Sequence, residues 1–391
     1  MASGVWYSNQ SYFGMKICKA VKYTESGNSE IVGVSNTDNL YRTGRLPASY
    51  LIPKDDPQYD RDGSSALGVF GYMVNSRCWI YDAGLALLVF THSGDYDICK
   101  EMQKRLRIEQ NTDGSFNFSY DLYIGQLFQG YVRTGSIGWL VWGMCHYALE
   151  TGDTQFLDII AKAGNWLLSQ QILTESDPRY GLLTGGYGSY ESDYTYIDEK
   201  ITWCSVEHQC SSLQALEGCA LLLGDAEYKQ AAELIRQQLR RVCYDEVNKR
   251  FYQGIGPESV DEAWALDCTT WAGMILLSIT NSEYSKGCLE TAEEAYLTTE
   301  KSIIRSTSME YYNQTYSSDQ LFSGFRPYSD RTADYAGAPD LIWTEGTLGY
   351  SALALMLGET EEAKKYVDEC IKLQNCNGST GGVLYTTATY A

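Results

Sequence analysis

Acidic residues and tryptophans recur close together along this 391-residue sequence. A carboxyl group can donate or accept a proton, and two carboxyls on either side of a glycosidic bond can hydrolyse it. An indole ring offers a flat apolar face and a polar edge, which together suit a sugar ring. The acid–indole groups are Trp79 with Asp82, Trp203 with Glu207, Trp264 with Asp267, and Trp343 with Glu345, and a related group holds Arg133 and Trp139.

Helix capping is the competing explanation for these acids. A carboxylate in the first turn of a helix contributes up to about 1 kcal/mol through the helix dipole, which accounts for any single acid. It does not account for a tryptophan beside each acid, nor for Glu345 when Thr344 is already available as a cap. We therefore predict a sugar-binding cleft. The catalytic candidates are Glu345, Asp267, Glu207 and Asp82, and the substrate-binding candidates are Trp343, Trp271, Trp264, Trp203, Trp139, Trp79, Tyr81, Arg133 and His208.

The composition favours a sugar-like ligand and disfavours two other classes of partner. The chain has 32 Tyr and 9 Trp against 10 Phe, so most of its aromatic rings carry a polar edge; a general Tyr-rich habit of the source organism is the plainer explanation. The formal net charge is -20, and such a surface repels phosphate backbones and anionic lipid headgroups. We expect a carbohydrate partner, no nucleic acid and no membrane, and the oligomeric state stays open.

Cysteine and histidine usage argues against a metal centre. The chain has 12 Cys and 3 His without any C-x-x-C motif, and Cys145 and His146 are the only adjacent Cys–His pair. Zinc sites need closely spaced ligands of these types, so we expect no metal and no other cofactor. The first residues lack the apolar centre of a signal peptide, while N-x-S/T sequons are compatible with secretion. The mature segment of a secreted or cell-surface protein is favoured over a cytoplasmic protein.

A repeat of helix pairs positions the candidate residues. Each unit has an apolar helix, a short turn that is mostly Gly-Asp or Gly-Glu, and a more charged helix. A helix that is apolar all round is buried on every side, whereas a helix with one apolar stripe forms an outer layer. We predict an all-α (α/α)6 barrel whose inner helices all begin at one mouth, where the acids gather. The units span 79–114, 136–171, 204–245, 263–300 and 342–378.

The remaining segments leave the sixth hairpin of the barrel open. Residues 64–75 are a candidate part of it, and an incomplete barrel is the alternative. Residues 15–35 have the pattern of a β-hairpin, and a stretch rich in Pro and Asp follows. We therefore divide the chain into an N-terminal irregular or β-hairpin segment, 1–62, and an α/α barrel domain, 63–391.

Five segments together carry a family resemblance. In the order YDAGLAL, RTGSIGWLVW, VEHQCSSLQAL, ALDCTTWAG and IWTEGTLGYSALAL, they resemble the six-hairpin glycosidase-like proteins, which have an (α/α)6 barrel. The similarity is closest to a loosely characterised bacterial branch with the motifs Y-D-x-A-L, T-E-H-N, L-D-x-Q-T-W and W-x-E-G-T. This sequence departs at Gln209, where that branch usually has Asn. The site residues implied by the resemblance are Tyr81, Asp82, Glu207, His208, Asp267, Trp271, Trp343 and Glu345.

The residues and the resemblance together predict a glycoside hydrolase that cleaves a neutral, glucan-like poly- or oligosaccharide. Because most barrels of this kind are inverting, the resemblance implies the inverting course. Glu345 suits the acid, since Trp343 and a helix of small residues surround it and an apolar surround raises a carboxyl pKa. Asp267 or Asp82 would then be the base, although sequence alone leaves the pair open among the four acids.

Three alternatives stay open. A sugar epimerase would use pairs of His, and the chain has 3 His in all. A polysaccharide lyase would use a Tyr or His base with an Arg cluster for uronate, and an acidic mouth disfavours an anionic substrate. A non-catalytic carbohydrate-binding or structural protein would keep the tryptophans but would not need the carboxylates.

Overall fold

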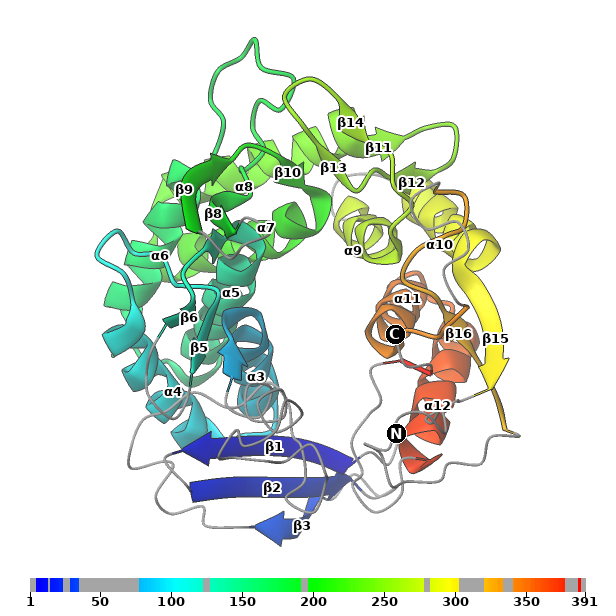
Figure 1. The fold of residues 1–391 in the computed structure, drawn as a ribbon, viewed down its shortest axis with the longest axis horizontal. Coiled ribbons are helices and arrows are strands. Elements are labelled where there is room, and N and C mark those ends of the chain that lie inside the picture. Colours follow the sequence, from blue (N-terminus) through cyan, green and yellow to red (C-terminus); the bar gives the residue numbers. More distant parts are fainter. Residues whose placement is uncertain are drawn as a thin grey trace.

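The computed structural model describes residues 5–12, 15–23, 29–34, 77–121, 127–190, 196–277, 282–301, 320–332, 340–376 and 386–387. Ten α-helices lie in these residues, and they form two concentric layers (Figure 1). The inner helices are α3 (Ile80–His92), α5 (Thr134–Thr151), α7 (Val206–Leu223), α9 (Leu266–Leu276) and α11 (Thr344–Met356). The outer helices are α4 (Tyr96–Glu109), α6 (Leu157–Ser169), α8 (Ala226–Gln238), α10 (Ser282–Tyr296) and α12 (Thr360–Cys376), and a π-helical turn, η1 (Leu239–Cys243), continues α8.

The two layers follow from the distribution of apolar side chains. The inner helices α5 and α7 bury residues on most of their surface, whereas outer helices such as α4 and α8 bury one stripe and carry charges on the other face. Successive inner helices pack against one another around the ring, and each also packs against the outer helix that follows it. The structure therefore confirms the predicted barrel of helical hairpins.

Glycines set two features of this ring. An added Cβ at Gly84 of α3 would lie 2.5 Å from the Trp139 carbonyl carbon, and one at Gly143 of α5 would lie 2.5 Å from the Gly84 carbonyl oxygen. These two inner helices therefore touch backbone to backbone.

The glycines of the predicted turns all adopt the left-handed conformation that ends a helix, which confirms that part of the prediction. Their φ angles are 79° at Gly94, 69° at Gly152, 70° at Gly224 and 86° at Gly358.

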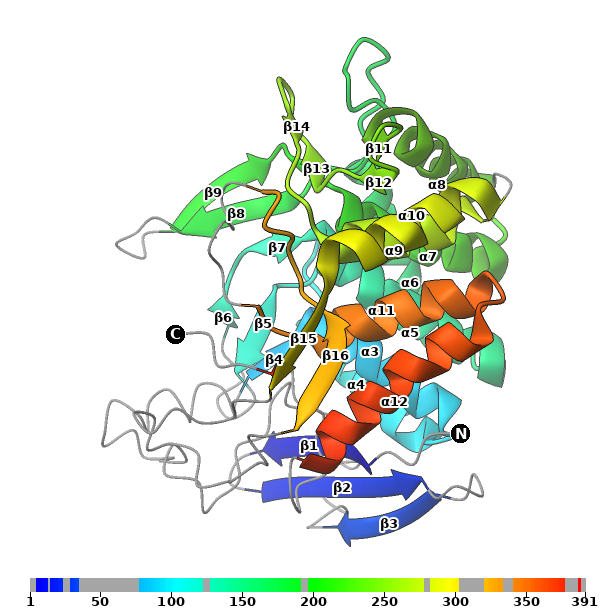
Figure 2. The ribbon, with the colours of Figure 1, turned by 90° about the vertical axis from the view of Figure 1, so that its right-hand side faces the viewer.

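Short antiparallel strands or bridges lead into every inner helix. β4, β7 and β10 run directly into α3, α5 and α7, while the isolated bridges Ala265–Tyr328 and Trp343–Thr386 precede α9 and α11. These strands gather at the end of the ring where the inner helices begin, which we call the mouth (Figure 2). Three of the three-stranded sheets include a strand that leads into an inner helix: β4 (Arg77–Trp79), β5 (Ser119–Asp121) and β6 (Leu127–Gln129); β7 (Val132–Arg133), β8 (Gly186–Tyr190) and β9 (Tyr196–Ile201); and β10 (Cys204–Ser205), β13 (Gly254–Ile255) and β14 (Val260–Asp261).

Two of the sequence predictions concern segments that form strands. The predicted hairpin at 15–35 is confirmed by β2 (Met15–Tyr23) and β3 (Ser29–Val34), and β1 (Val5–Tyr12) adds a strand that was not predicted. The predicted helix ending at residue 300 is wrong in its last part, because β15 (Leu297–Lys301), with its β-branched threonines, pairs with β16 (Leu321–Phe325). The remaining pair is β11 (Tyr244–Asp245) with β12 (Arg250–Phe251). Residues 64–75 and the boundary between 62 and 63 lie outside the described residues.

The barrel interior contains many thiols. The chain has 12 cysteines, and the ten whose side chains the structure describes are all free and buried, where each acts as a small apolar side chain. Cys145 of α5 and Cys219 of α7 are in contact, with their sulfur atoms 4.0 Å apart. Among the described helices, none is long and apolar enough to cross a membrane.

Candidate active site

Four inner helices present a carboxyl group from their first turn. Each of these helices begins after a residue with extended backbone dihedrals, so the chain changes abruptly from strand to helix. The acid follows two or three positions later, and this change of direction fixes where its side chain leaves the backbone. The four are Asp82 after Trp79 on α3, Glu207 after Ser205 on α7, Asp267 after Ala265 on α9, and Glu345 after Trp343 on α11.

Capping explains little of this arrangement. Ser205 already caps α7, because its hydroxyl accepts a hydrogen bond from the His208 N–H at 3.5 Å. The predicted Thr344 cap is wrong, since Trp343 occupies the N-cap position and Thr344 is the first residue of the helix. Asp267 does act partly as a cap, because its Oδ1 accepts the Cys268 N–H at 2.8 Å.

The acids lie close enough to shift one another's pKa. Burial raises the pKa of Glu207 to about 8, and the charges of Asp267 and Glu345 add to that shift. Burial also raises the pKa of Glu345, with contributions from Asp267 and Asp82, and it raises the pKa of Asp267. No Lys or Arg of the described ranges offsets these shifts at Glu207, Asp267 or Glu345. The structure thus brings the four predicted acids together.

Tyr81 connects α3 to α11, the first and last inner helices of the described residues. Its hydroxyl donates a hydrogen bond to Glu345 Oε1 at 2.6 Å. That bond stabilises the ionised form of Glu345 and opposes the rise in its pKa. The same surroundings raise the pKa of Tyr81, first through burial and then through Glu345, so the phenol keeps its proton and stays a donor.

An aromatic cluster lies beside the acids. Tyr81 meets Trp139 edge to face with centroids 5.5 Å apart, and Trp139 meets Trp271 in the same way at 5.4 Å. Trp142, which was not predicted, stacks on Trp139 at 4.9 Å. The Trp139 indole lies near enough to Glu207 to oppose part of the rise in its pKa, although its Nε1 has no partner at hydrogen-bond geometry. Trp142 follows Trp139 by three positions, so helical spacing could have predicted it.

His208 and Arg133 border the acids. His208 Nε2 lies 3.7 Å from Glu207 Oε2, and burial together with the charge of Arg133 lowers the His208 pKa to about 4, so the imidazole is neutral at pH 7. Its Nδ1 is buried and has no hydrogen-bond partner. Arg133 Nη1 donates to the carbonyl oxygens of Val132, Tyr187 and Gly188 at 3.1, 3.1 and 2.9 Å. These bonds hold the guanidinium in place beside His208.

The predicted tryptophans divide into three groups. Trp139 and Trp271 belong to the aromatic cluster, whereas Trp79 and Trp203 are half-buried at the mouth, and Trp203 faces the edge of His208 with centroids 6.5 Å apart. Trp264 and Trp343, also predicted as substrate-binding residues, are only 9% and 8% exposed and pack in one core cluster, so they present little ring surface to a ligand.

Trp264 is buried for an identifiable reason. The guanidinium carbons of Arg250 and Arg331 lie 4.2 and 4.8 Å from its ring centroid, so cations cover the indole that sequence analysis assigned to a sugar.

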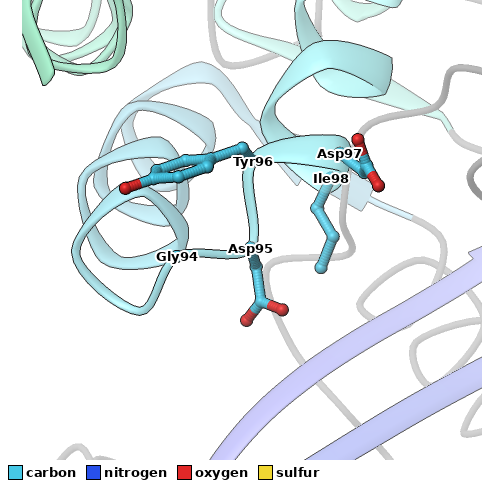
Figure 3. A pocket seen from close by; sticks show the side chains of 5 residues that line it. All are labelled: Gly94, Asp95, Tyr96, Asp97 and Ile98. Carbon is cyan, nitrogen blue, oxygen red and sulfur yellow. The ribbon is translucent and has the colours of Figure 1, made fainter. Parts of the chain in front are cut away.

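Two other features do not add to the site. Among the described residues, no group of three or more His, Cys, Asp and Glu is placed to hold a metal ion. A shallow cavity of about 330 Å³ lies at the turn between α3 and α4, lined by Gly94, Asp95, Tyr96, Asp97 and Ile98. Its side chains point in different directions rather than converging (Figure 3). It lies about 18 Å along α3 from Asp82, at the opposite end of that helix.

Solved structures share this architecture. A glycosidase matches with a TM-score of 0.55 at 12% identity, over 89% of this chain and 83% of its own. An α-amylase from Clostridium perfringens matches with a TM-score of 0.54 at 12% identity, over 80% and 82%. A D-mannose isomerase matches with a TM-score of 0.53 at 11% identity, over 81% and 82%. The chain has the fold of the six-hairpin glycosidase-like proteins. No protein-family model and no curated protein matches the sequence.

The departure of this chain from the six-hairpin glycosidase-like motif at Gln209 has a structural explanation. Gln209 is fully buried and pairs with the backbone of Leu183, donating through Nε2 to its carbonyl at 2.9 Å and accepting its N–H through Oε1 at 2.8 Å. Its Nε2 also donates to the Ser205 carbonyl at 3.0 Å. The two bonds to Leu183 join the start of α7 to the chain before β8, and the bond to Ser205 lies within the start of α7, so Gln209 supports the position of Glu207 from behind.

Proposed function

We propose that this protein is a glycoside hydrolase that cleaves a neutral poly- or oligosaccharide at the mouth of the barrel. The observation that carries the proposal is the raised pKa of Glu207 close to Glu345, a carboxyl that is hydrogen-bonded by Tyr81. The reaction needs one protonated and one ionised carboxyl; burial favours the protonated form of Glu207, and the hydrogen bond from Tyr81 favours the ionised form of Glu345. A glycosidase and an α-amylase with barrels of the same shape support the proposal by analogy of fold.

Glu207 is the general acid. With a pKa of about 8 it holds a proton at pH 7 and can give it to the leaving glycosidic oxygen. The sequence prediction gave this role to Glu345. The bond from Tyr81 favours the ionised form of Glu345, so that residue is better suited to the opposite role.

Glu345 is the general base. It takes a proton from a water molecule while the water oxygen bonds to the anomeric carbon and the bond from that carbon to the glycosidic oxygen breaks. The proton of Glu207 goes to the departing oxygen, and the sugar is released with inverted configuration. Asp267, which is coupled to both residues, stabilises the positive charge that develops on the sugar ring in the transition state. Trp139 and Trp271 provide the apolar wall beside the sugar.

The surrounding charges favour a neutral substrate. Asp267, Glu345 and Asp82 converge on one site with Glu207, and a uronate or sugar phosphate would be repelled by those carboxyls that are ionised. Glucans are therefore the first substrates to test, ahead of anionic polysaccharides.

A sugar isomerase or epimerase is the second candidate, and one observation favours it. His208 is neutral near pH 7, its Nδ1 has no partner, and it lies 3.7 Å from Glu207. A neutral imidazole in such a place can take a proton from a sugar carbon.

One experiment separates these candidates. The protein is incubated in D2O with a panel of neutral glucans, mannans and disaccharides, and the products are followed by NMR. The hydrolase proposal predicts new reducing ends whose first anomer is inverted, and no deuterium on carbon. Deuterium at a sugar carbon without cleavage would favour the isomerase. Binding of a glycan with neither change would replace both by a carbohydrate-binding protein.

The variant arm uses two glutamates of the same helix. Glu207→Gln should abolish cleavage, whereas Glu217→Gln, which alters an ion pair with Arg236 away from the mouth, should retain it. Equal activity in the two variants would rule out Glu207 as the acid.

A further inference from the structure

A second group of ring-bearing side chains lies at the edge of the mouth. The guanidinium carbon of Arg133 lies 4.1 Å from the ring centroid of Tyr131, and the rings of Tyr131 and Phe118 lie 4.7 Å apart with a 33° tilt. All three side chains are half-buried, so each keeps part of its surface open. They form a short stack of two rings and one planar cation.

The β8–β9 hairpin extends this stack. Arg133 lies across β8, because its Nη1 donates to the carbonyls of Tyr187 and Gly188. Gly188 has a φ of 83°, and an added Cβ there would lie 2.3 Å from the hydroxyl oxygen of Tyr196. The Tyr196 ring therefore fills the space above this glycine, and its side chain is 41% exposed. Tyr196 also lies near enough to Arg133 to affect its pKa.

Arg133 connects this group to the acids. Its charge helps to lower the pKa of His208, and His208 touches Glu207, the proposed acid. β7, β8 and β9 lie at the same end of the molecule as the starts of the inner helices (Figure 2). The surface of rings therefore begins next to the bond-cleaving groups and continues outward to an exposed tyrosine.

We propose that Tyr131, Arg133 and Tyr196 form an outer sugar-binding subsite for units of a neutral oligosaccharide beyond the cleaved bond. This rests on the proposed glycosidase function and deepens it, because the preferred substrate is then a chain of several sugars. Tyrosine rings offer apolar faces to sugar rings, and phenol and guanidinium groups donate to hydroxyls. The three residues carry no carboxylate, so the subsite recognises the chain through stacking and hydroxyl contacts.

The test measures how affinity depends on chain length. Calorimetry is performed with the Glu207→Gln protein, so that the ligand is not consumed, using oligosaccharides of two to six units from α-1,4-glucan, β-1,4-glucan and mannan. We expect affinity to rise with length in one series. Adding Tyr196→Ala should reduce that gain by about ten-fold, as expected for loss of a tyrosine contact of about 1.4 kcal/mol. Tyr196→Phe should keep most of the gain, because it keeps the ring.

Tyr96→Ala is the matched control. Tyr96 is 38% exposed, close to the value for Tyr196, but it lies at the turn between α3 and α4, away from the mouth. An unchanged length dependence in Tyr196→Ala, an equal loss in Tyr96→Ala, or no length dependence in any series would overturn the subsite. Failure of the hydrolase proposal is a separate result. If binding depends on chain length and on Tyr196 but the unmodified protein cleaves nothing, the hydrolase proposal is wrong and the subsite proposal stands.

Discussion

At the ends of the inner helices that face away from the mouth, acidic residues follow the turn glycines and have partners for their charge. The pKa of Asp153 lies below its ordinary value, because it accepts the Gln155 N–H at 2.9 Å and the Tyr147 hydroxyl at 2.9 Å. Asp225 caps α8 by accepting the Glu227 N–H at 2.9 Å. At the mouth, by contrast, burial and neighbouring carboxyls raise the pKa of Glu207 and Glu345.

Acidic residues therefore stabilise the folded state at the ends of the inner helices away from the mouth, whereas at the mouth their ionised forms destabilise it. A carboxyl with a lowered pKa favours the folded state once it is ionised. A carboxyl with a raised pKa binds its proton more tightly in the folded state, so raising the pH through that range weakens folding. Proteins tolerate such a cost where a proton must be available for chemistry, which is how we interpret the mouth.

The largest expected difference in hydrolytic rate is between variants of two glutamates, one at the start of α11 and one just after its end. Glu345→Gln should reduce hydrolysis by about 10²–10⁴-fold, since it removes the base while keeping the shape of the side chain. Glu359→Gln, at the exposed turn after the same helix, should keep full activity. Steady-state rates on the best substrate of the panel measure both. A near-normal rate for Glu345→Gln would move the base to Asp267.

A smaller effect is expected from Tyr81→Phe. Losing the donor raises the pKa of Glu345, so the base is protonated at higher pH and the acidic limb of the pH–rate profile moves upward. The rate on that limb should fall by about 10- to 100-fold, because a hydrogen bond to a charged group contributes roughly 1.5–3 kcal/mol. The measurement is kcat/KM against pH. A uniform loss at every pH would instead indicate a purely structural role for Tyr81.

At the other end of the ring, Asp153→Asn should affect stability and leave catalysis unchanged. The free energy of unfolding at pH 7 should fall by about 1 kcal/mol, since charge-assisted hydrogen bonds to Gln155 and Tyr147 are weakened. Because the folded pKa is lowered, this difference should be present above the ordinary Asp pKa and disappear as the pH falls through the folded value. Denaturant titrations at pH 7 and in acid provide the check. If Asp153→Asn lost activity but kept normal stability, Asp153 would have a role in catalysis, and the proposed contrast between the two ends of the inner helices would be wrong.

The smallest effect is expected at Leu221, near the end of α7 that faces away from the mouth. Its side chain is 73% exposed, so Leu221→Ser removes little buried surface. The free energy of unfolding should change by no more than about 0.5 kcal/mol, and activity should be unaffected. A loss of several kcal/mol in a denaturant titration would show that this end is covered by another surface.

Local sequence rules predicted much of the fold and the location of the acids. Gly94 with Asp95 and Gly152 with Asp153 mark helix ends because a left-handed glycine ends a helix, whatever the rest of the chain does. The apolar helices that follow Asp82 and Glu345 likewise indicated that both acids stand at helix starts.

Contacts between distant segments could not be predicted in this way. Tyr81 and Glu345 are 264 positions apart, and they meet only because the ring brings α3 near α11. The burial of Trp264 depends on Arg250 and Arg331, which approach it from separate parts of the chain. The roles that we propose for Glu207 and Glu345 rest on the contact with Tyr81 and on the neighbouring acids from other helices, which the sequence did not reveal, and the sequence prediction placed the acid on Glu345 instead.

The most direct test is the pH dependence of unfolding for the unmodified protein and for Glu207→Gln. The ordinary glutamate pKa is 4.5, and the folded value for Glu207 is about 8. Between these values the folded state holds a proton that the unfolded state has lost, so the unmodified protein should become progressively less stable than the variant as the pH rises from 5 to 8. Above pH 8 the difference should level off. Parallel stability curves across this range would show that Glu207 ionises normally, and would contradict its assignment as a protonated acid at the mouth.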